Sequence, residues 1–148
     1  MIPIQALNLI KRFEGFRSTP YLCSAGVPTI GYGSTYYKDG TKVTLNDSKI
    51  DIDTATDLLV YTITRSFIPS INKLCPNICN DEPKMGAIIS WTYNLGATRL
   101  KNSTLRKRIV EEKWEEAAKE ILKWNLNLGK PSRGLTIRRQ AEKDLFLS

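Results

Sequence analysis

The spacing of apolar residues changes along the chain from helical to strand-like and back again. From Ile4 to Phe13, apolar residues recur at intervals of three, which is the spacing of one buried helix face. Gly15 fits the end of this helix. The pattern therefore predicts an amphipathic helix that carries Glu14 at its carboxyl end.

Short apolar and aromatic runs follow between positions 18 and 33. The runs TPYLC, SAGVP and TIGYG are broken by turn residues, a pattern typical of short strands joined by turns. We expect two short strands here and a further hairpin that turns through Lys38, Asp39 and Gly40. Residues 14 to 50 are therefore predicted to form a small lobe that contains β-structure.

A connecting helix is predicted from Ile52 to Phe67. Asp51 supplies the side-chain oxygen that an N-cap needs, and the apolar residues at 55, 58, 59 and 63 form one stripe. Pro69 is expected to end the helix, because proline lacks the backbone N–H that a helix interior uses. This helix joins the β-containing lobe to the remainder.

Residues 81 to 148 are expected to form a helical lobe together with the first helix. Asp81 and Pro83 fit the start of a helix and Gly96 fits its end. The run between them is apolar on nearly every side, which predicts a central core helix. Three more helices are expected: one beyond the cap Ser103, one from Trp114 to Trp124 and one from about Leu135 to Leu147.

These elements predict the α+β class, mostly helical, in one domain over residues 1 to 148. A composition of 41% hydrophobic and 25% charged residues is that of a compact globular protein. No segment has the continuous apolar core of a signal peptide or the length of a membrane span. We therefore expect a protein that is made in a cytoplasm, with no stable membrane insertion. We also expect it to be a monomer.

The chain contains no histidine, which narrows its chemistry. Histidine is the usual base of Ser-His and Cys-His pairs and a usual zinc ligand. Carboxylates remain the chief acid–base groups. Cys75 and Cys79 lack the two further ligands of a zinc site, and the three cysteines are too few and odd in number for a disulfide framework. We expect no metal and no cofactor.

The formal charge of +7 lies mainly in the carboxyl-terminal part. Residues 99 to 148 hold 13 Lys and Arg against 7 Asp and Glu, whereas residues 1 to 98 hold 9 against 8. A basic face favours an anionic polymer, either a nucleic acid or a bacterial envelope. Ordinary helix pairs between neighbouring Lys and Glu explain the charges of residues 113 to 123 equally well.

Glu14, Cys23 and Thr29 follow one another with eight and then five residues between them. A helix end and a hairpin can bring such residues to one cleft. The segments FEGFR, TIGYGST, YNLG, STLRKRI, LKWN and GLTIRRQAEKDLFL occur in the order found in the phage-type lysozymes, the muramidase endolysins of glycoside hydrolase family 24. The sequence resembles this family over essentially its whole length.

The resemblance implies a two-lobed, lysozyme-like fold and a general acid at Glu14. Glu14 would protonate the oxygen of the β-1,4 bond between N-acetylmuramic acid and N-acetylglucosamine in peptidoglycan, because that oxygen leaves poorly without a proton. The role requires Glu14 to stay protonated, hence a partly buried, apolar setting. Candidates to supply this setting are Phe13, Phe16 and Tyr32.

The resemblance also implies that Cys23 and Thr29 position the attacking water in an inverting displacement. Cys23 stands where many family members have aspartate, and a free thiol is mostly protonated at neutral pH. We therefore expect weaker activity or activity shifted to higher pH, unless local positive charge favours the thiolate. Alternatively, Cys23 is a small half-buried apolar residue and Thr29 an ordinary strand residue.

Several further positions have open interpretations. Ser34 replaces the histidine that family members commonly have after GYG, which affects local packing rather than the reaction. Arg138 or Arg139 approaches Glu14 and orients it, or both are surface charge; neither is counted as catalytic. The tryptophans lie on apolar helix faces and are expected in the core: Trp91, Trp114 and Trp124.

Three other functions fit parts of the sequence. Nucleic-acid binding would use the basic half, but we find no helix-turn-helix or aromatic RNA-binding stretch, so no nucleic-acid partner is expected. A lytic transglycosylase would use a lone glutamate without Cys23 and Thr29. A wall-binding protein could have lost turnover through the cysteine. The expected partners are peptidoglycan glycan strands and, without an export signal, a separate holin-type protein that opens a route to the cell wall.

Overall fold

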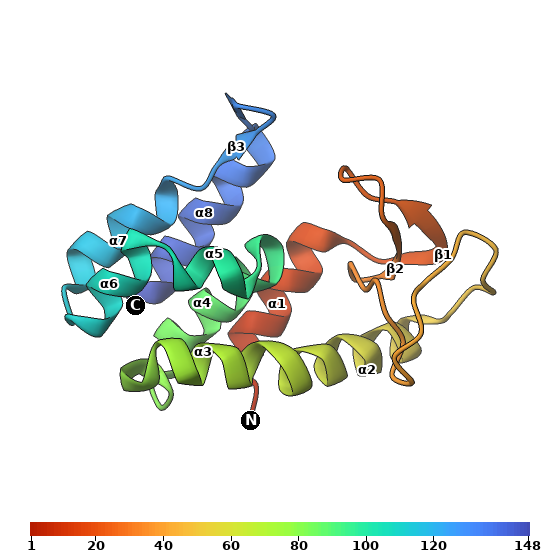
Figure 1. Cartoon of the computed structure of the whole chain (residues 1–148), viewed down its shortest axis with the longest axis horizontal. Helices are drawn as coiled ribbons and strands as arrows, with labels where there is room; N and C mark the ends of the chain where they lie inside the picture. The colour runs from red at the N-terminus through yellow and green to blue at the C-terminus, as the bar shows by residue number, and fades with distance from the viewer.

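The computed structural model describes all residues from 1 to 148 and has two lobes joined by a long helical segment (Figure 1). The smaller lobe contains an antiparallel hairpin of β1 (Arg17–Leu22) and β2 (Pro28–Gly31), in which Tyr21 pairs with Thr29. The larger lobe is helical. The predicted α+β, mostly helical class is confirmed.

The first helix, α1 (Ile4–Glu14), ends where the sequence predicts. Gly15 has a φ of 71°, and its N–H donates to the carbonyl of Lys11. Ala6 and Ile10 are fully buried on the face that packs against α4 (Glu82–Leu95). Because this face is fixed in the helical lobe, Glu14 lies where the chain leaves that lobe for the hairpin.

The second predicted hairpin is present as a tight turn rather than a pair of strands. Gly40 has a φ of 88°, and its N–H donates to the carbonyl of Tyr37. Tyr36 and Lys42 form an isolated antiparallel bridge beside the turn. The loop is further tied by Asp47, which accepts a hydrogen bond of 2.7 Å from the Tyr37 hydroxyl.

The connecting helix is longer than predicted. It comprises α2 (Ile52–Thr62), a π-helical turn η1 (Ile63–Phe67) and α3 (Ile68–Leu74). The expectation that Pro69 ends the helix is wrong. In the π-helical turn the Ile68 N–H donates to the Ile63 carbonyl, five residues earlier. This register change places Pro69 in the first turn of α3, where a missing N–H is tolerated.

The central helix α4 has the predicted ends. The Asp81 side chain accepts a hydrogen bond from the Lys84 N–H, and Gly96 ends the helix with a φ of 96°. Every residue from Met85 to Thr92 is buried. The helix is thus the core of the larger lobe, as its continuous apolar pattern predicts.

Four helices follow α4, one more than the three predicted. The short helix α5 (Ala97–Lys101) was not expected. The others match: α6 (Thr104–Val110) is capped by Ser103, α7 is Trp114–Leu122 and α8 is Arg133–Phe146. A small hairpin, β3 (Leu126–Asn127) and β4 (Lys130–Pro131), was also missed, because two-residue strands carry no periodicity. A 3-10 turn η2 (Pro76–Ile78) precedes α4.

The tryptophans pack as predicted. Trp91 is fully buried, and its ring meets that of Trp124 edge-on with centroids 5.3 Å apart. Trp114 lies against Phe146 and is partly buried. None of the helices has the length and apolar character needed to cross a membrane.

Candidate active site

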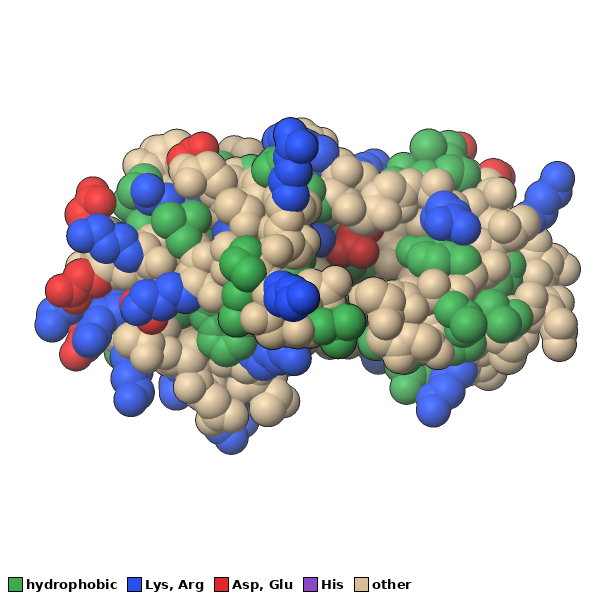
Figure 2. All heavy atoms as spheres, turned by 90° about the horizontal axis from the view of Figure 1, so that it is seen from above, with side chains coloured by type: hydrophobic (Ala, Val, Ile, Leu, Met, Phe, Trp, Pro, Cys, Tyr) green, Lys and Arg blue, Asp and Glu red, His purple; other side chains and the backbone are tan.

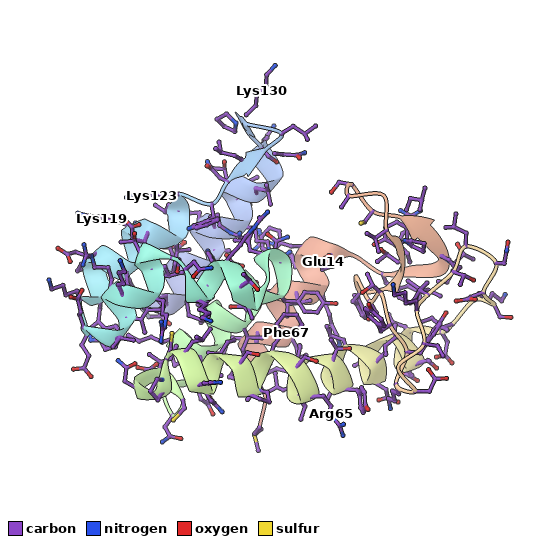
Figure 3. The ribbon with its side chains drawn as sticks, in the orientation of Figure 1. Glu14, Arg65, Phe67, Lys119, Lys123 and Lys130 are labelled. Atoms are coloured by element: carbon purple, nitrogen blue, oxygen red, sulfur yellow. The ribbon has the colours of Figure 1, made fainter.

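Glu14 lies between the two lobes (Figure 3). A view from above shows acidic atoms inside the hollow that separates the lobes (Figure 2). The Glu14 side chain is 21% exposed. The backbone of Gly33 lies directly against it, since a Cβ at this position would be 2.8 Å from Glu14 Oε1. The end of α1 and the residues after β2 thus close around one carboxylate.

Arg138 on α8 holds the other carboxylate oxygen. Its Nη1 donates a hydrogen bond of 2.6 Å to Glu14 Oε2, and Nη2 donates to the Ser90 carbonyl at 3.1 Å. The Arg138 side chain is only 4% exposed. A buried guanidinium bound at several points has little freedom to move. Glu14 therefore has one defined orientation.

A second carboxylate, that of Glu142, also forms an ion pair with Arg138. Glu142 Oε2 lies 3.3 Å from Arg138 Nε, and Glu142 Oε1 lies 2.7 Å from Arg139 Nε. The Ser90 hydroxyl donates a 2.6 Å hydrogen bond to Glu142. Burial raises the pKa of Glu142, and the two arginines oppose this rise. Arg138 thus lies between Glu14 and Glu142, and Arg139 pairs with Glu142, which reduces the energetic cost of burying the two arginines.

The interpretation of Arg138 and Arg139 as surface charge is wrong, because both are buried. The alternative, that one of them contacts Glu14, describes Arg138. Glu142 was not singled out from the sequence at all. Its three- and four-residue spacing from the arginines was the available signal, since such residues share one face of a helix.

Several aromatic residues lie near the carboxyl end of α1. The Phe13 ring lies 5.8 Å from Arg138 Cζ, and the rings of Phe16 and Tyr32 are 5.7 Å apart. Tyr93 on α4 donates a 2.6 Å hydrogen bond to the Tyr32 carbonyl. Burial raises the pKa of Tyr93, and the nearby charge of Glu14 raises it further.

Cys23 and Thr29 lie together at the tip of the β1–β2 hairpin. Thr29 is 2% exposed, and its hydroxyl donates a 2.8 Å hydrogen bond to the Val27 carbonyl. Cys23 is a free, half-buried thiol. Hydrogen bonding to the backbone of Val27, then of Ala25, and to the Thr29 hydroxyl lowers the pKa of the Cys23 thiol. The local cause is hydrogen bonding rather than the positive charge considered from the sequence.

Tyr21 on β1 is influenced by the charges of both parts of the site. Burial raises the pKa of Tyr21, and the charges of Glu14 and Cys23 add to this rise. Tyr21 is therefore within electrostatic range of both groups. The arrangement offers a carboxyl group on the helical side of the cleft and a polarised thiol with a neighbouring hydroxyl on the hairpin side.

The other two cysteines lie outside this site. Cys75 is buried and Cys79 exposed, and neither forms a disulfide. Burial raises the pKa of the Cys75 thiol to about 11. The structure has no group of three or more Cys, Asp or Glu side chains able to hold a metal ion.

Comparison with known proteins places the chain in a family. The model of the phage lysozyme family matches residues 11 to 142. The chain belongs to the phage lysozyme family. It is 36% identical over 154 aligned positions to the endolysin of Acyrthosiphon pisum secondary endosymbiont phage 1, covering 97% of this chain and 96% of that protein. Membership of this family supports a peptidoglycan-lysing function.

A second relative is longer than this chain. The endolysin of Bacillus phage B103 is 33% identical over 147 residues, which are 96% of this chain but 52% of that protein. The chain thus spans about half the length of that relative. Among solved structures, the endolysin of Escherichia coli O157:H7 phage FAHEc1 superposes with a TM-score of 0.87 and 33% identity, covering 100% of this chain and 94% of that chain. The lysozyme-like fold is confirmed.

Proposed function

We propose that the protein is a muramidase endolysin that hydrolyses the β-1,4 bond between N-acetylmuramic acid and N-acetylglucosamine in peptidoglycan. The observation that carries this proposal is the fixed position of Glu14 between the lobes, held by Arg138 and approached closely by Gly33. A single oriented carboxyl group facing an open cleft is what protonation of a glycosidic oxygen requires.

Glu14 acts as the general acid. Its proton passes to the bridging oxygen as the bond to the sugar carbon breaks, so the leaving group departs as a neutral hydroxyl. Arg138 orients Glu14 and also forms an ion pair with Glu142. Arg138 is a positioning residue, because its contacts are with Glu14 and the helical lobe rather than with the cleft.

Cys23 and Thr29 place the attacking water on the opposite side of the sugar. The Cys23 thiolate accepts a proton from the water as the water oxygen bonds to the sugar carbon, and the Thr29 hydroxyl, which hydrogen-bonds with Cys23, holds that side chain in the hairpin. The lowered pKa of Cys23 supports this role, because thiolate is present at a lower pH than for an ordinary cysteine. The product then has inverted configuration at the sugar carbon.

The place of action follows from this substrate. A peptidoglycan-cleaving endolysin acts on the cell wall after synthesis in the host cytoplasm, and a holin-type partner opens its route across the inner membrane. We expect lysis of cells only when such a partner is co-expressed. Lysis on expression of this chain alone would contradict that part of the proposal.

Product analysis tests the bond that is cut. Purified peptidoglycan is digested, its new ends are reduced with borohydride, and the reduced sugars are identified after acid hydrolysis. The proposal predicts reduced muramic acid. Reduced glucosamine would indicate cleavage of the other glycosidic bond, and 1,6-anhydromuramic ends would indicate a lytic transglycosylase. Binding of peptidoglycan without new ends would indicate a wall-binding protein.

A further inference from the structure

The π-helical turn η1 is a feature of the connecting helix that the proposed chemistry does not use. Such turns are rare and recur at functional sites. Here Ser66 and Phe67 of the turn line a cavity of about 360 Å³, and Arg65 and Ser66 line a second cavity of about 340 Å³. The turn thus contributes to the walls of two neighbouring spaces.

The two cavities are adjacent, and we refer to them together as the groove. Tyr36, Thr62 and Ser66 line both of them. Gly33, whose backbone lies beside the Glu14 carboxylate, lines the first cavity. In Figure 3, Phe67 lies between Glu14 and Arg65, and Arg65 points outward from the connecting helix. The groove therefore leads away from the site of bond cleavage toward the outer face of this helix.

The first cavity is uncharged and offers hydroxyl groups. Ser34 is 3% exposed, and its Oγ forms no hydrogen bond, although it lies near enough to Tyr93 to oppose the rise in the pKa of that hydroxyl. A buried hydroxyl without a partner is unfavourable unless a ligand or water pairs with it. The ring of Phe67 packs on that of Tyr93 with centroids 5.4 Å apart. Aromatic walls and a free hydroxyl suit an amino sugar.

The second cavity is cationic. Lys38 Nζ lies 5.7 Å and Arg65 Cζ lies 5.4 Å from the centre of the Tyr61 ring, and no Asp or Glu lines this cavity. The Tyr61 hydroxyl is fixed by donating a 3.2 Å hydrogen bond to the Lys38 carbonyl. Two cations held beside one aromatic ring suit a carboxylate. At the junction of the cavities, Tyr36 is 49% exposed.

We propose that this groove binds one muramoyl unit of the glycan, with the sugar ring in the first cavity and a carboxylate carried by that unit at Lys38 and Arg65. The inference rests on the proposed function and adds a carboxylate-reading subsite to it. The carboxylate can come from the lactyl group of a peptide-free unit or from the stem peptide of a peptide-bearing one. A chitin oligosaccharide carries neither.

The test measures dissociation constants by titration calorimetry in the Glu14→Gln background, which prevents cleavage. The ligands are a peptide-free muramoyl oligosaccharide, a peptide-bearing glycan fragment and a chitin oligosaccharide of equal length. In the double variant Lys38→Gln/Arg65→Gln, we expect at least one carboxylate-bearing ligand to bind roughly tenfold more weakly, as for loss of a charge-assisted hydrogen bond. Chitin binding should not change. The ligand whose affinity falls identifies the source of the carboxylate.

Two further variants complete the test. Lys119→Gln/Lys123→Gln removes the same charge from the helical lobe and should leave all three affinities unchanged. Ser34→Ala should weaken the binding of all three ligands by roughly threefold, since the Ser34 hydroxyl pairs with the sugar ring. Unchanged affinities in Lys38→Gln/Arg65→Gln, or equal weakening for chitin, would overturn the inference. These results do not depend on which bond the wild type cuts, so product analysis tests the proposed function separately.

Discussion

At the scale of single residues, glycine is required at position 33. Its φ is +85°, and a Cβ would be 2.8 Å from Glu14 Oε1. We expect Gly33→Ala to destabilise the fold by about 1 kcal/mol through its left-handed backbone and to slow peptidoglycan clearing by displacing Glu14. Gly40→Ala is the matched control, because it has a φ of +88° with nothing within 4 Å.

Urea unfolding and turbidity clearing of both variants check this prediction. Gly40→Ala should lose a similar amount of stability while clearing peptidoglycan at the wild-type rate. If the two variants cleared at the same rate, the close approach of Gly33 to Glu14 would have no part in activity.

Cys23 gives the activity a predictable dependence on pH. Hydrogen bonding with Val27 lowers the pKa of the thiol, so the thiolate forms at a lower pH than in an ordinary cysteine. Clearing should rise as the pH increases through this lowered pKa. Cys23→Ala should lose the rise, and Cys23→Asp should move it toward about pH 4, where aspartate ionises. Rates between about pH 4 and about pH 9 check this, with the exposed Cys79→Ala as control.

The same profile in Cys23→Ala and the wild type would mean that the thiol only fills space. That outcome would favour the simpler interpretation of Cys23 as a small apolar residue. It would leave the assignment of Glu14 untouched.

Some single-residue features could be predicted from the sequence and others could not. Gly15 marks the end of α1, so the sequence is enough to place Glu14 at a helix end. The contact between Glu14 and Arg138 joins residues 124 positions apart. No local pattern contains that contact, and a pair of arginines on a helix has the same sequence whether it is buried or exposed.

At the scale of elements, α8 presents Arg138 to Glu14 and depends on its N-cap. The Ser132 hydroxyl accepts a hydrogen bond from the Leu135 N–H. Ser132→Ala should lower the free energy of unfolding by about 1 kcal/mol, whereas Ser132→Asp should retain the cap. Urea denaturation of the two variants measures the difference. Equal stability of Ser132→Ala and Ser132→Asp would show that the cap contributes nothing.

Elements bounded by caps and glycines could be predicted, and those set by tertiary packing could not. Asp51, Asp81 and Gly96 each occupy the cap position that the sequence indicates. Pro69 is different, because the π-helical turn before it changes the hydrogen-bond register and lets the helix continue. The five residues of α5 are too few to show a helical period.

At the scale of the whole molecule, each lobe supplies one part of the site. Glu14, the proposed general acid, is held by the helical lobe through Arg138, and the proposed water-positioning residues Cys23 and Thr29 belong to the hairpin of the other lobe. The connecting helix sets the distance between them. The order of sequence segments was enough to predict the lobes, but the groove beside η1 could not be predicted because it depends on the unexpected π-helical turn.

The most direct test of the account compares peptidoglycan clearing by the wild type, Glu14→Gln and Glu115→Gln. Glu115 is an exposed residue of α7, so its variant controls for loss of a negative charge. With all three proteins folded, we predict that Glu14→Gln clears at least about 100-fold more slowly, as for loss of a general acid, and that Glu115→Gln matches the wild type. Clearing by Glu14→Gln at the wild-type rate would contradict the assignment of Glu14 as the general acid.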